Sequence, residues 1–500
     1  MTKNKILSKL FLVNIAILVS YCTFGEKEKN NRYTLIRAVP KSSSQLQYLH
    51  SLMSNAHSGE VDFWRFSGTL NKSCDLMVDV STLKNLSEQF KHTNIDYTII
   101  IHDVGNLILS QEKRKARRRP VSPYYVEQVP GYYFNLAAYH SYGEISNFID
   151  WAEMMFPNLA KSHIIGYTHE KRPIRLLQIG LSDYPKPAIW LDAGIHAREW
   201  IAPSTALIII TELLTNYESD PSVKAYVDQL TWYILPVVNP DGLEFSRASS
   251  DPRVRLWRKN RSAATCTSSI RDCCFGVDLN RNFDFKWGEI GGSNNPCDEI
   301  YQGSGPFSEP ETDAIRRFIT NRNGEFAAFL TLHSYSQIWM YPFGHKRQVY
   351  SSDVRQLRDT ALRASRALYS VYKTRYEVGT GADLLYPASG GSDDWAKAVA
   401  GIKYSYLLEL RPHRDSWQGF LLDESHILPT GKETWEGIKV VADEVLSATS
   451  RTVYTSALTA STLPWCQDED PFLCRWWAIN GGCHVGSVIA LRCPVSCGIC

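Results

Sequence analysis

The sequence predicts an α/β protein whose central sheet is mixed or largely parallel, with a smaller unit before it and another after it along the chain. Three observations indicate this class. Apolar strand patterns alternate with helical segments through the middle of the 500-residue chain, a shorter alternation precedes them, and six of the twelve cysteines lie between residues 466 and 500. A length of 500 residues also corresponds to about three domains.

Residues 1–25 have the pattern of a secretory signal peptide. Lys3, Lys5 and Lys9 precede an apolar stretch at 10–21, and small residues follow. An uncleaved membrane anchor is the alternative, but the apolar stretch is short for crossing a bilayer, and no later stretch qualifies as a membrane helix. We therefore expect a secreted, extracellular protein with no membrane span.

Composition and cysteine usage agree with secretion. The formal net charge of +2 and the 44% of hydrophobic residues are those of an ordinary globular protein, and they give no reason to expect a nucleic-acid partner. The cysteine-dense end indicates an oxidising compartment. Three glycosylation sequons, at Asn71, Asn85 and Asn260, are weak individually but consistent with it.

A small α+β unit is predicted within residues 26–118. The pattern gives strands at 33–39, 61–66, 75–80 and 97–104, with helices at 43–53 and 80–90. The order βαββαβ suits a ferredoxin-like fold. A free-standing binding domain would show the same pattern.

The basic run from Lys113 to Arg119 follows this unit. Basic runs are usually solvated surface or nucleic-acid patches. This run lies between a unit that follows a signal peptide and a second, larger domain, and in that position a protease cleavage site is the better interpretation. We expect an activating protease to cut near Arg117 or Arg118, because Pro120 makes the bond after Arg119 a poor substrate.

The central domain, residues 119–446, supplies the main sheet. Strands are predicted at 187–195, 231–238, 326–332 and 402–410, and a helix at 202–217. His196, His333 and Glu409 fall at or just beyond the carboxyl ends of predicted strands. In open α/β sheets that edge is where binding sites form.

His196, Glu199 and the distant His333 form a candidate zinc centre. Two imidazoles and one carboxylate leave one tetrahedral position open for water, which distinguishes a hydrolytic zinc from a structural one. The His-x-x-Glu pair alone is weak evidence, because these residues often meet at that spacing by chance.

Four further motifs follow in order: Leu256-Trp257-Arg258-Lys259, the run from Val277 to Phe283, the run from Tyr386 to Trp395, and Leu408-Glu409-Leu410-Arg411. With the zinc residues, they resemble the pancreatic-type zinc metallocarboxypeptidases, the A/B family, over about residues 132–446. The resemblance implies a carboxypeptidase-type α/β sandwich with a mixed sheet, one Zn²⁺, and peptide or protein substrates with a free C-terminus. It also implies that the N-terminal unit is an inhibitory propeptide.

The same resemblance assigns roles in catalysis and binding. Glu409 would be the general base, although a buried ion pair with Arg411 would also explain a carboxylate in this apolar strand. Arg258 would stabilise the oxyanion. Asn280 and Arg281 would hold the terminal carboxylate under Tyr386. Arg198 and Tyr335 would bind substrate further from the scissile bond.

Asp393 determines the expected side-chain preference. By resemblance, it lies at the base of the specificity pocket, where an acid favours C-terminal Lys or Arg. Gly344 and Gly381 would leave room for a long side chain. The alternatives are a solvated loop acid and an A-type preference for apolar ends.

Residues 465–500 resemble the six-cysteine ShK toxin-like module. That resemblance implies the pairs Cys466–Cys500, Cys474–Cys493 and Cys483–Cys497, whereas the sequence alone leaves 15 connectivities open. So short a unit needs disulfides to hold it. The toxin's Lys-Tyr pair is absent, so docking to a matrix component or protein is favoured over channel blocking. Residues 447–464, rich in Ser and Thr, are expected to be a linker.

Of the six other cysteines, Cys22 falls in the predicted signal peptide and five lie in the N-terminal unit and the central domain. Family spacing implies a Cys274–Cys297 disulfide, and Cys266 and Cys273 are additional disulfide candidates. Cys74 is left over as a buried thiol. A catalytically idle secreted binding protein acting through the cysteine module is the alternative function, and the presence of Glu409 and all three zinc ligands argues against it.

Overall fold

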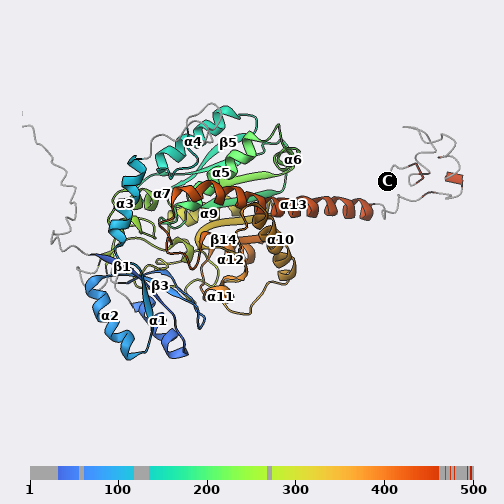
Figure 1. Cartoon of the computed structure of the whole chain (residues 1–500). Helices are drawn as coiled ribbons and strands as arrows, with labels where there is room; N and C mark the ends of the chain where they lie inside the picture. Colours follow the sequence, from blue (N-terminus) through green and yellow to red (C-terminus); the bar gives the residue numbers. More distant parts are fainter. Residues whose placement is uncertain are drawn as a thin grey trace, which may run out of the picture.

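The computed structural model describes residues 32–55, 61–117, 134–266 and 273–460, and residues 468, 473, 474, 478, 493, 496 and 497 (Figure 1). The predicted signal peptide, the residues after Arg117 at the predicted cleavage site and most of the cysteine-rich tail therefore lie outside the described residues. In the part that is described, no helix combines the length and the apolar character needed to cross a membrane.

The N-terminal unit is a four-stranded antiparallel sheet in the order β2-β3-β1-β4, with two helices. This is the predicted βαββαβ arrangement. Its elements are β1 (Tyr33–Ala38), α1 (Ser43–Asn55), β2 (Val61–Arg65), β3 (Cys74–Asp79), α2 (Val80–His92) and β4 (Tyr97–Ile101).

A third helix, α3 (Val104–Arg117), was not expected. It contains most of the basic run that sequence reasoning treated only as a solvated cleavage region. Its first turns are held by burial of Val104 and Ile108 in a cluster shared with Leu256 and Phe420 of the larger domain. Tertiary packing of one apolar face therefore stabilises a helix that also carries exposed charged residues such as Glu112 and Lys113.

The larger domain is built on one eight-stranded mixed sheet in the order β13-β12-β14-β11-β7-β8-β6-β5. β7, β8, β11 and β14 form its parallel centre, and antiparallel pairs occur at β5·β6, β6·β8 and β12·β14. The strands are β5 (Ala160–Tyr167), β6 (Pro173–Ile179), β7 (Ala188–Ala193), β8 (Thr231–Leu235), β11 (Phe326–Ser336), β12 (Ile338–Tyr341), β13 (Glu377–Thr380) and β14 (Tyr404–His413).

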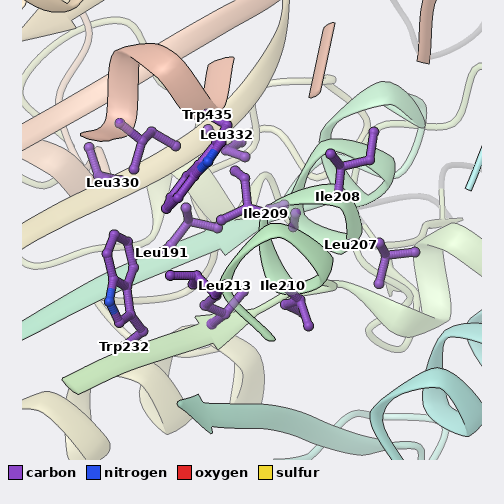
Figure 2. Packing of buried hydrophobic residues seen from close by; sticks show 14 of the residues in the cluster. Leu191, Leu207, Ile208, Ile209, Ile210, Leu213, Trp232, Leu330, Leu332 and Trp435 are labelled. Atoms are coloured by element: carbon purple, nitrogen blue, oxygen red, sulfur yellow. The ribbon is translucent and has the colours of Figure 1, made fainter. Parts of the chain in front are cut away.

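Helices cover both faces of this sheet, giving the expected α/β sandwich. One face packs against α4 (Tyr142–Met155), α5 (Ile201–Thr215), α6 (Pro221–Gln229), α10 (Val354–Tyr372) and α13 (Ile427–Ala460). The other packs against α9 (Pro310–Thr320) and α12 (Ser392–Ala398). Figure 2 shows the first of these cores, where Leu191 and Trp232 of the sheet meet α5 and Trp435 of α13. The short elements α7 (Pro240–Arg247), α8 (Pro252–Arg255) and α11 (Gly381–Leu384) lie in the loops.

The segment expected to be a linker is helical over most of its length. α13 continues through Ala460, whereas residues 447–464 were predicted to be a linker on their Ser and Thr content. Extending an existing helix requires no new nucleation, so a sequence of modest propensity can follow a well-packed first part. Figure 1 shows the end of α13 projecting beyond the body of the domain.

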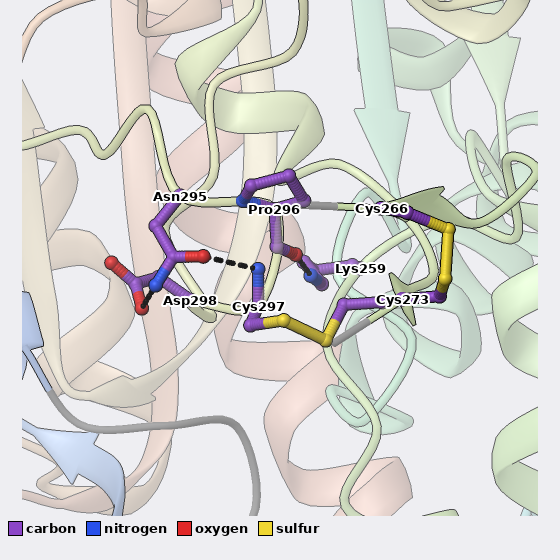
Figure 3. Close-up of a disulfide and its surroundings, with 8 residues drawn as sticks. Lys259, Cys266, Cys273, Asn295, Pro296, Cys297 and Asp298 are labelled. Atoms are coloured by element: carbon purple, nitrogen blue, oxygen red, sulfur yellow. Dashed lines mark hydrogen bonds between the residues drawn. A yellow bond between two sulfur atoms is a disulfide. The ribbon is translucent and has the colours of Figure 1, made fainter. Parts of the chain in front are cut away.

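Two adjacent disulfides lie in the loop after Arg258 (Figure 3): Cys266–Cys273 closes part of this loop on itself, and Cys274–Cys297 ties it to the loop at Cys297. Cys474 pairs with Cys493 in the tail. Cys497 is also disulfide-bonded. The pairings Cys466–Cys500 and Cys483–Cys497 involve residues outside the described part and stay predictions.

Four side chains noted in the sequence differ in exposure. Cys74 is a buried free thiol, as expected. Asn71 and Asn85 are exposed on the N-terminal unit. Asn260 is fully buried and its amide bonds Glu309 and Glu311, so this sequon is inaccessible to a glycan in the folded domain.

Candidate metal centre and substrate cleft

The three candidate metal ligands come together at the carboxyl-end side of the parallel strands. His196 and Glu199 follow β7, and His333 lies on the neighbouring strand β11. The Nδ1 atom of His196 lies 2.7 Å from Glu199 Oε1 and 3.2 Å from His333 Nδ1. Nδ1 of His333 lies 3.3 Å from Glu199 Oε2. All three side chains are buried.

This donor set fits a tetrahedral zinc ion. Ligand atoms that each lie about 2.0–2.2 Å from zinc are separated from one another by roughly 3.3 Å, close to the separations observed. His196 Nε2 faces Asp278 Oδ1 at 3.1 Å, which orients the ring with Nδ1 toward the metal position. Burial lowers the pKa of His196, and the neutral imidazole is the form that binds metal.

Glu409 lies opposite His333 in the parallel pairing of β14 with β11. Its Oε2 is buried without a hydrogen-bond partner in the described part of the chain, and burial raises the pKa of Glu409 to about 8. Arg411, considered above as an ion-pair partner, instead lies 2.5 Å from Glu433 Oε2. The carboxyl group of Glu409 is therefore available to the cleft.

The strand positions of two site residues differ from the prediction. His333 and Glu409 were placed at or beyond the strand ends, but β11 continues to Ser336 and β14 to His413. The last residues of each strand, near the cleft, include polar side chains, so a prediction based on apolar runs ended each strand too early.

Asp278 connects the metal ligands to Arg258. Its Oδ2 accepts hydrogen bonds from Nε and Nη2 of Arg258 at 3.1 and 2.9 Å, while its Oδ1 faces His196. One buried carboxylate thus fixes both a metal ligand and a guanidinium. Asp278 lies within the motif from Val277 to Phe283, but no role was predicted for it. The feature of the sequence that could have indicated a role is that Asp278 lies two residues before Asn280.

Asn280, Arg281 and Tyr386 form a second cluster in the same cleft. Arg281 Nη2 donates to the Tyr386 hydroxyl at 2.9 Å, and its Nε donates to the Gly291 carbonyl at 2.8 Å. Asn280 Oδ1 accepts from the backbone N–H of Ser392 at 3.0 Å. These contacts hold a planar guanidinium in the cleft, a geometry suited to a carboxylate ligand.

Two consecutive aspartates at the start of α12 have different surroundings. Both oxygens of Asp394 accept from the Gly344 N–H at 2.9 Å, and one lies 3.8 Å from His345 Nδ1. Both aspartates line the same cavity with Gly344 and Gly381, but no ion pair to the Asp393 carboxylate is found within the described residues. Burial, followed by repulsion from Asp394, raises the pKa of Asp393 to about 7. Asp393 is thus the one of these two aspartates that has no ion-pair partner in the described part of the chain.

The N-terminal unit covers the other end of the cleft. Nη1 of Arg198 donates to both oxygens of Asp62, at 2.9 and 2.8 Å, and Nη2 donates to the Phe63 carbonyl at 3.2 Å. The Tyr335 hydroxyl donates to Asp75 Oδ2 at 3.2 Å. Two residues expected to bind substrate are therefore bonded to acids of the N-terminal unit, a partnership that no local sequence pattern could reveal.

Comparison with protein families gives two matches. Residues 145–437 match the zinc carboxypeptidase family, and residues 36–111 match the carboxypeptidase activation peptide.

Two curated relatives and one solved structure are similar to more than half of this chain. Carboxypeptidase A2 of Mus musculus is 37% identical over 411 residues, which is 82% of this chain and 93% of the relative. Carboxypeptidase B of Astacus astacus is 43% identical over 308 residues, covering 62% of this chain and 97% of the relative. Among solved structures, thrombin activatable fibrinolysis inhibitor (TAFI) aligns with a TM-score of 0.71 and 31% identity, covering 83% of this chain and 99% of the other.

Proposed function

The chain belongs to the zinc carboxypeptidase family and carries the family's activation propeptide, and from this premise we propose that it is a secreted exopeptidase that removes C-terminal Lys and Arg. The observation that supports the preference is that both Asp393 and Asp394 line the cleft, but Asp394 accepts from the Gly344 N–H while Asp393 has no ion-pair partner in the described part of the chain. A carboxylate in a confined pocket favours a cationic side chain.

The catalytic step uses residues that converge on the metal position. Zinc bound by His196, Glu199 and His333 would supply an activated water and polarise the scissile carbonyl. Glu409, which has no salt-bridge partner in the described structure, would take a proton from the attacking water and deliver it to the leaving amine. Arg258, held by Asp278, would face the developing oxyanion.

Recognition of a chain end would use the second cluster. Arg281 and Asn280 would bind the terminal carboxylate, and Tyr386, already bonded to Arg281 at 2.9 Å, would close over it. Because internal peptide bonds lack that carboxylate, this clamp restricts cleavage to the last bond. Arg198 and Tyr335 would contact residues further from the cut once the propeptide leaves.

Activation would follow cleavage near Arg117 or Arg118 by a protease specific for basic residues. The end of α3 at Arg117 lies beside this bond. Cleavage alone does not break the Asp62–Arg198 ion pair, so release of the propeptide is a separate step. The tail, with its Cys474–Cys493 disulfide, would be an ShK-like module that docks the enzyme to a matrix component or protein.

The experiment is a digest of matched peptides that differ only in a C-terminal Arg, Leu or Glu. Mass spectrometry would follow them with intact protein and with trypsin-treated protein. We expect loss of the terminal Arg after trypsin treatment and no loss with the intact precursor. Loss of Leu before Arg would support the A-type alternative, and no loss from any peptide would support the idle binding protein.

A further inference from the structure

A second group of metal-type ligands lies outside the substrate cleft, where the turn after β5 meets the start of α9. It consists of His169, Glu309 and Glu311, each of which offers a ligand atom within 4.8 Å of the others. His169 Nε2 lies 3.1 Å from Glu309 Oε2. Nothing in the peptidase chemistry derived above uses these residues.

Asn260 holds the two carboxylates together. Its Nδ2 donates to Glu309 Oε2 at 2.7 Å and to Glu311 Oε2 at 3.1 Å. Glu309 is 5% exposed and Glu311 is 0% exposed. Two acids are therefore buried side by side on one neutral amide, an arrangement that repels unless a positive species lies between them.

The described surroundings balance at most one of the two charges, because His169 pairs with Glu309, a contact that raises the pKa of His169, and no such pair to Glu311 is found there. Arg172, which lies on the same turn as His169, is paired with Glu170 and with Asp241, the latter at 2.7 Å. Oε1 of Glu311 is buried and has no hydrogen-bond partner in the described part of the chain. His169, with 34% of its side chain exposed, lies on the solvent side and lines a surface depression with Glu309. Solvent therefore has access to the group through His169.

We propose that His169, Glu309 and Glu311 bind a divalent transition-metal ion such as Zn²⁺, as a structural site separate from the catalytic one. One imidazole and two carboxylates are a donor set that zinc accepts. Ligand atoms on one ion lie no more than about 4 Å apart, so binding draws the exposed His169 side chain inward. The bound ion would supply the positive charge that balances the second carboxylate, and it would give Glu311 Oε1 a partner.

The site has a mechanical connection to the catalytic loops. Asn260 lies two residues after Arg258, and its Oδ1 accepts from the Val277 N–H at 2.8 Å, next to Asp278. An ion here would tie the turn after β5, the start of α9 and the loop carrying Arg258 into one unit. We therefore expect it to raise thermal stability without taking part in peptide hydrolysis.

Equilibrium dialysis of the intact precursor against micromolar ZnCl₂, with zinc counted by mass spectrometry, tests the site. Burial raises the pKa of Glu311 to about 7, so a proton competes with the ion and the measurement is made at about pH 8. We expect two zinc ions per chain in the wild type, one in His169→Ala and one in His196→Ala. The double variant should bind none.

His163→Ala is the matched control, because His163 lies on β5, close to His169 in sequence, and bonds only Gln178 among the contacts described. This variant should still bind two ions. Zinc should also raise the Tm of His196→Ala, and this increase should vanish in the double variant. Equal zinc content in the wild type and His169→Ala would overturn the proposal, whether or not the protein prefers Lys and Arg as a peptidase.

Discussion

The two ends of the substrate cleft interact differently with the propeptide. At one end, Arg198 and Tyr335 are bonded to Asp62 and Asp75 of the propeptide. At the other end, the propeptide contributes an edge-to-face contact between Phe66 and Tyr386, with ring centroids 5.4 Å apart. In the described chain, no propeptide acid reaches Arg281 or the zinc ligands. We therefore expect the propeptide to inhibit by covering the path of the substrate, with the proposed catalytic groups left in place.

The largest expected effects come from two variants, one that should lose the metal and one that should lose the general base. His333→Ala should lose both the catalytic zinc and activity, because one of three ligands is gone. Glu409→Gln should keep the zinc while turnover falls by about 10²–10⁴-fold, the usual contribution of a general base. Metal analysis and kcat of the activated variants provide the measurement. Both should still bind propeptide, since its ion pairs are elsewhere, and near-wild-type turnover in either variant would disprove the mechanism.

The next effect concerns the pocket end of the cleft. Asp393→Leu should reverse the preference from Arg to Leu or Phe, because the pocket would no longer contain a carboxylate that attracts a cationic side chain. We expect relative kcat/KM to change by about a hundredfold or more. Asp394→Asn is the control, since an amide oxygen can still accept from the Gly344 N–H. That control should retain the Arg preference. The same reversal in both variants would mean that Asp393 is not the residue that selects.

Sequence patterns predicted best those features of the fold that depend on residues close together along the chain. The strands of the ferredoxin-like unit and the parallel centre of the main sheet followed from apolar runs. The candidate ligands His196, Glu199 and His333, which the fold brings together, were predicted from a motif and a family resemblance, and the same resemblance predicted Arg281 as a residue of the cleft. α3 was missed because its stabilising contacts, around Val104 and Ile108, come from the other domain. The partnership of Arg198 with Asp62 joins residues 136 positions apart, and only the folded chain brings them together.

The propeptide end should respond to loss of a single ion pair. Asp62→Ala leaves the buried Arg198 guanidinium without its carboxylate, so released propeptide should inhibit the mature enzyme at least about tenfold more weakly. Asp96→Ala is the control, because that carboxylate is 73% exposed and pairs only with Lys41 on the surface. Inhibition constants for the two variant propeptides give the comparison. Equal constants would show that the ion pair contributes nothing to inhibition.

A smaller effect should appear with pH. Burial raises the pKa of Asp393 to about 7, so the carboxyl group becomes protonated as pH falls through that value and loses its attraction for a cation. The ratio of kcat/KM for Arg and Leu substrates should therefore fall by up to about tenfold between pH 8 and pH 6. Taking the ratio cancels titrations at the metal centre, which act on both substrates. A ratio that rises with acidity would contradict this sign.

The most direct test is the ratio of kcat/KM for two substrates identical except for a C-terminal Arg or Phe, measured on the trypsin-activated wild type. If Asp393 forms the base of the pocket, Arg should be preferred by roughly a hundredfold or more. A preference for Phe would contradict the assignment of Asp393 and would leave a zinc carboxypeptidase whose pocket selects apolar ends.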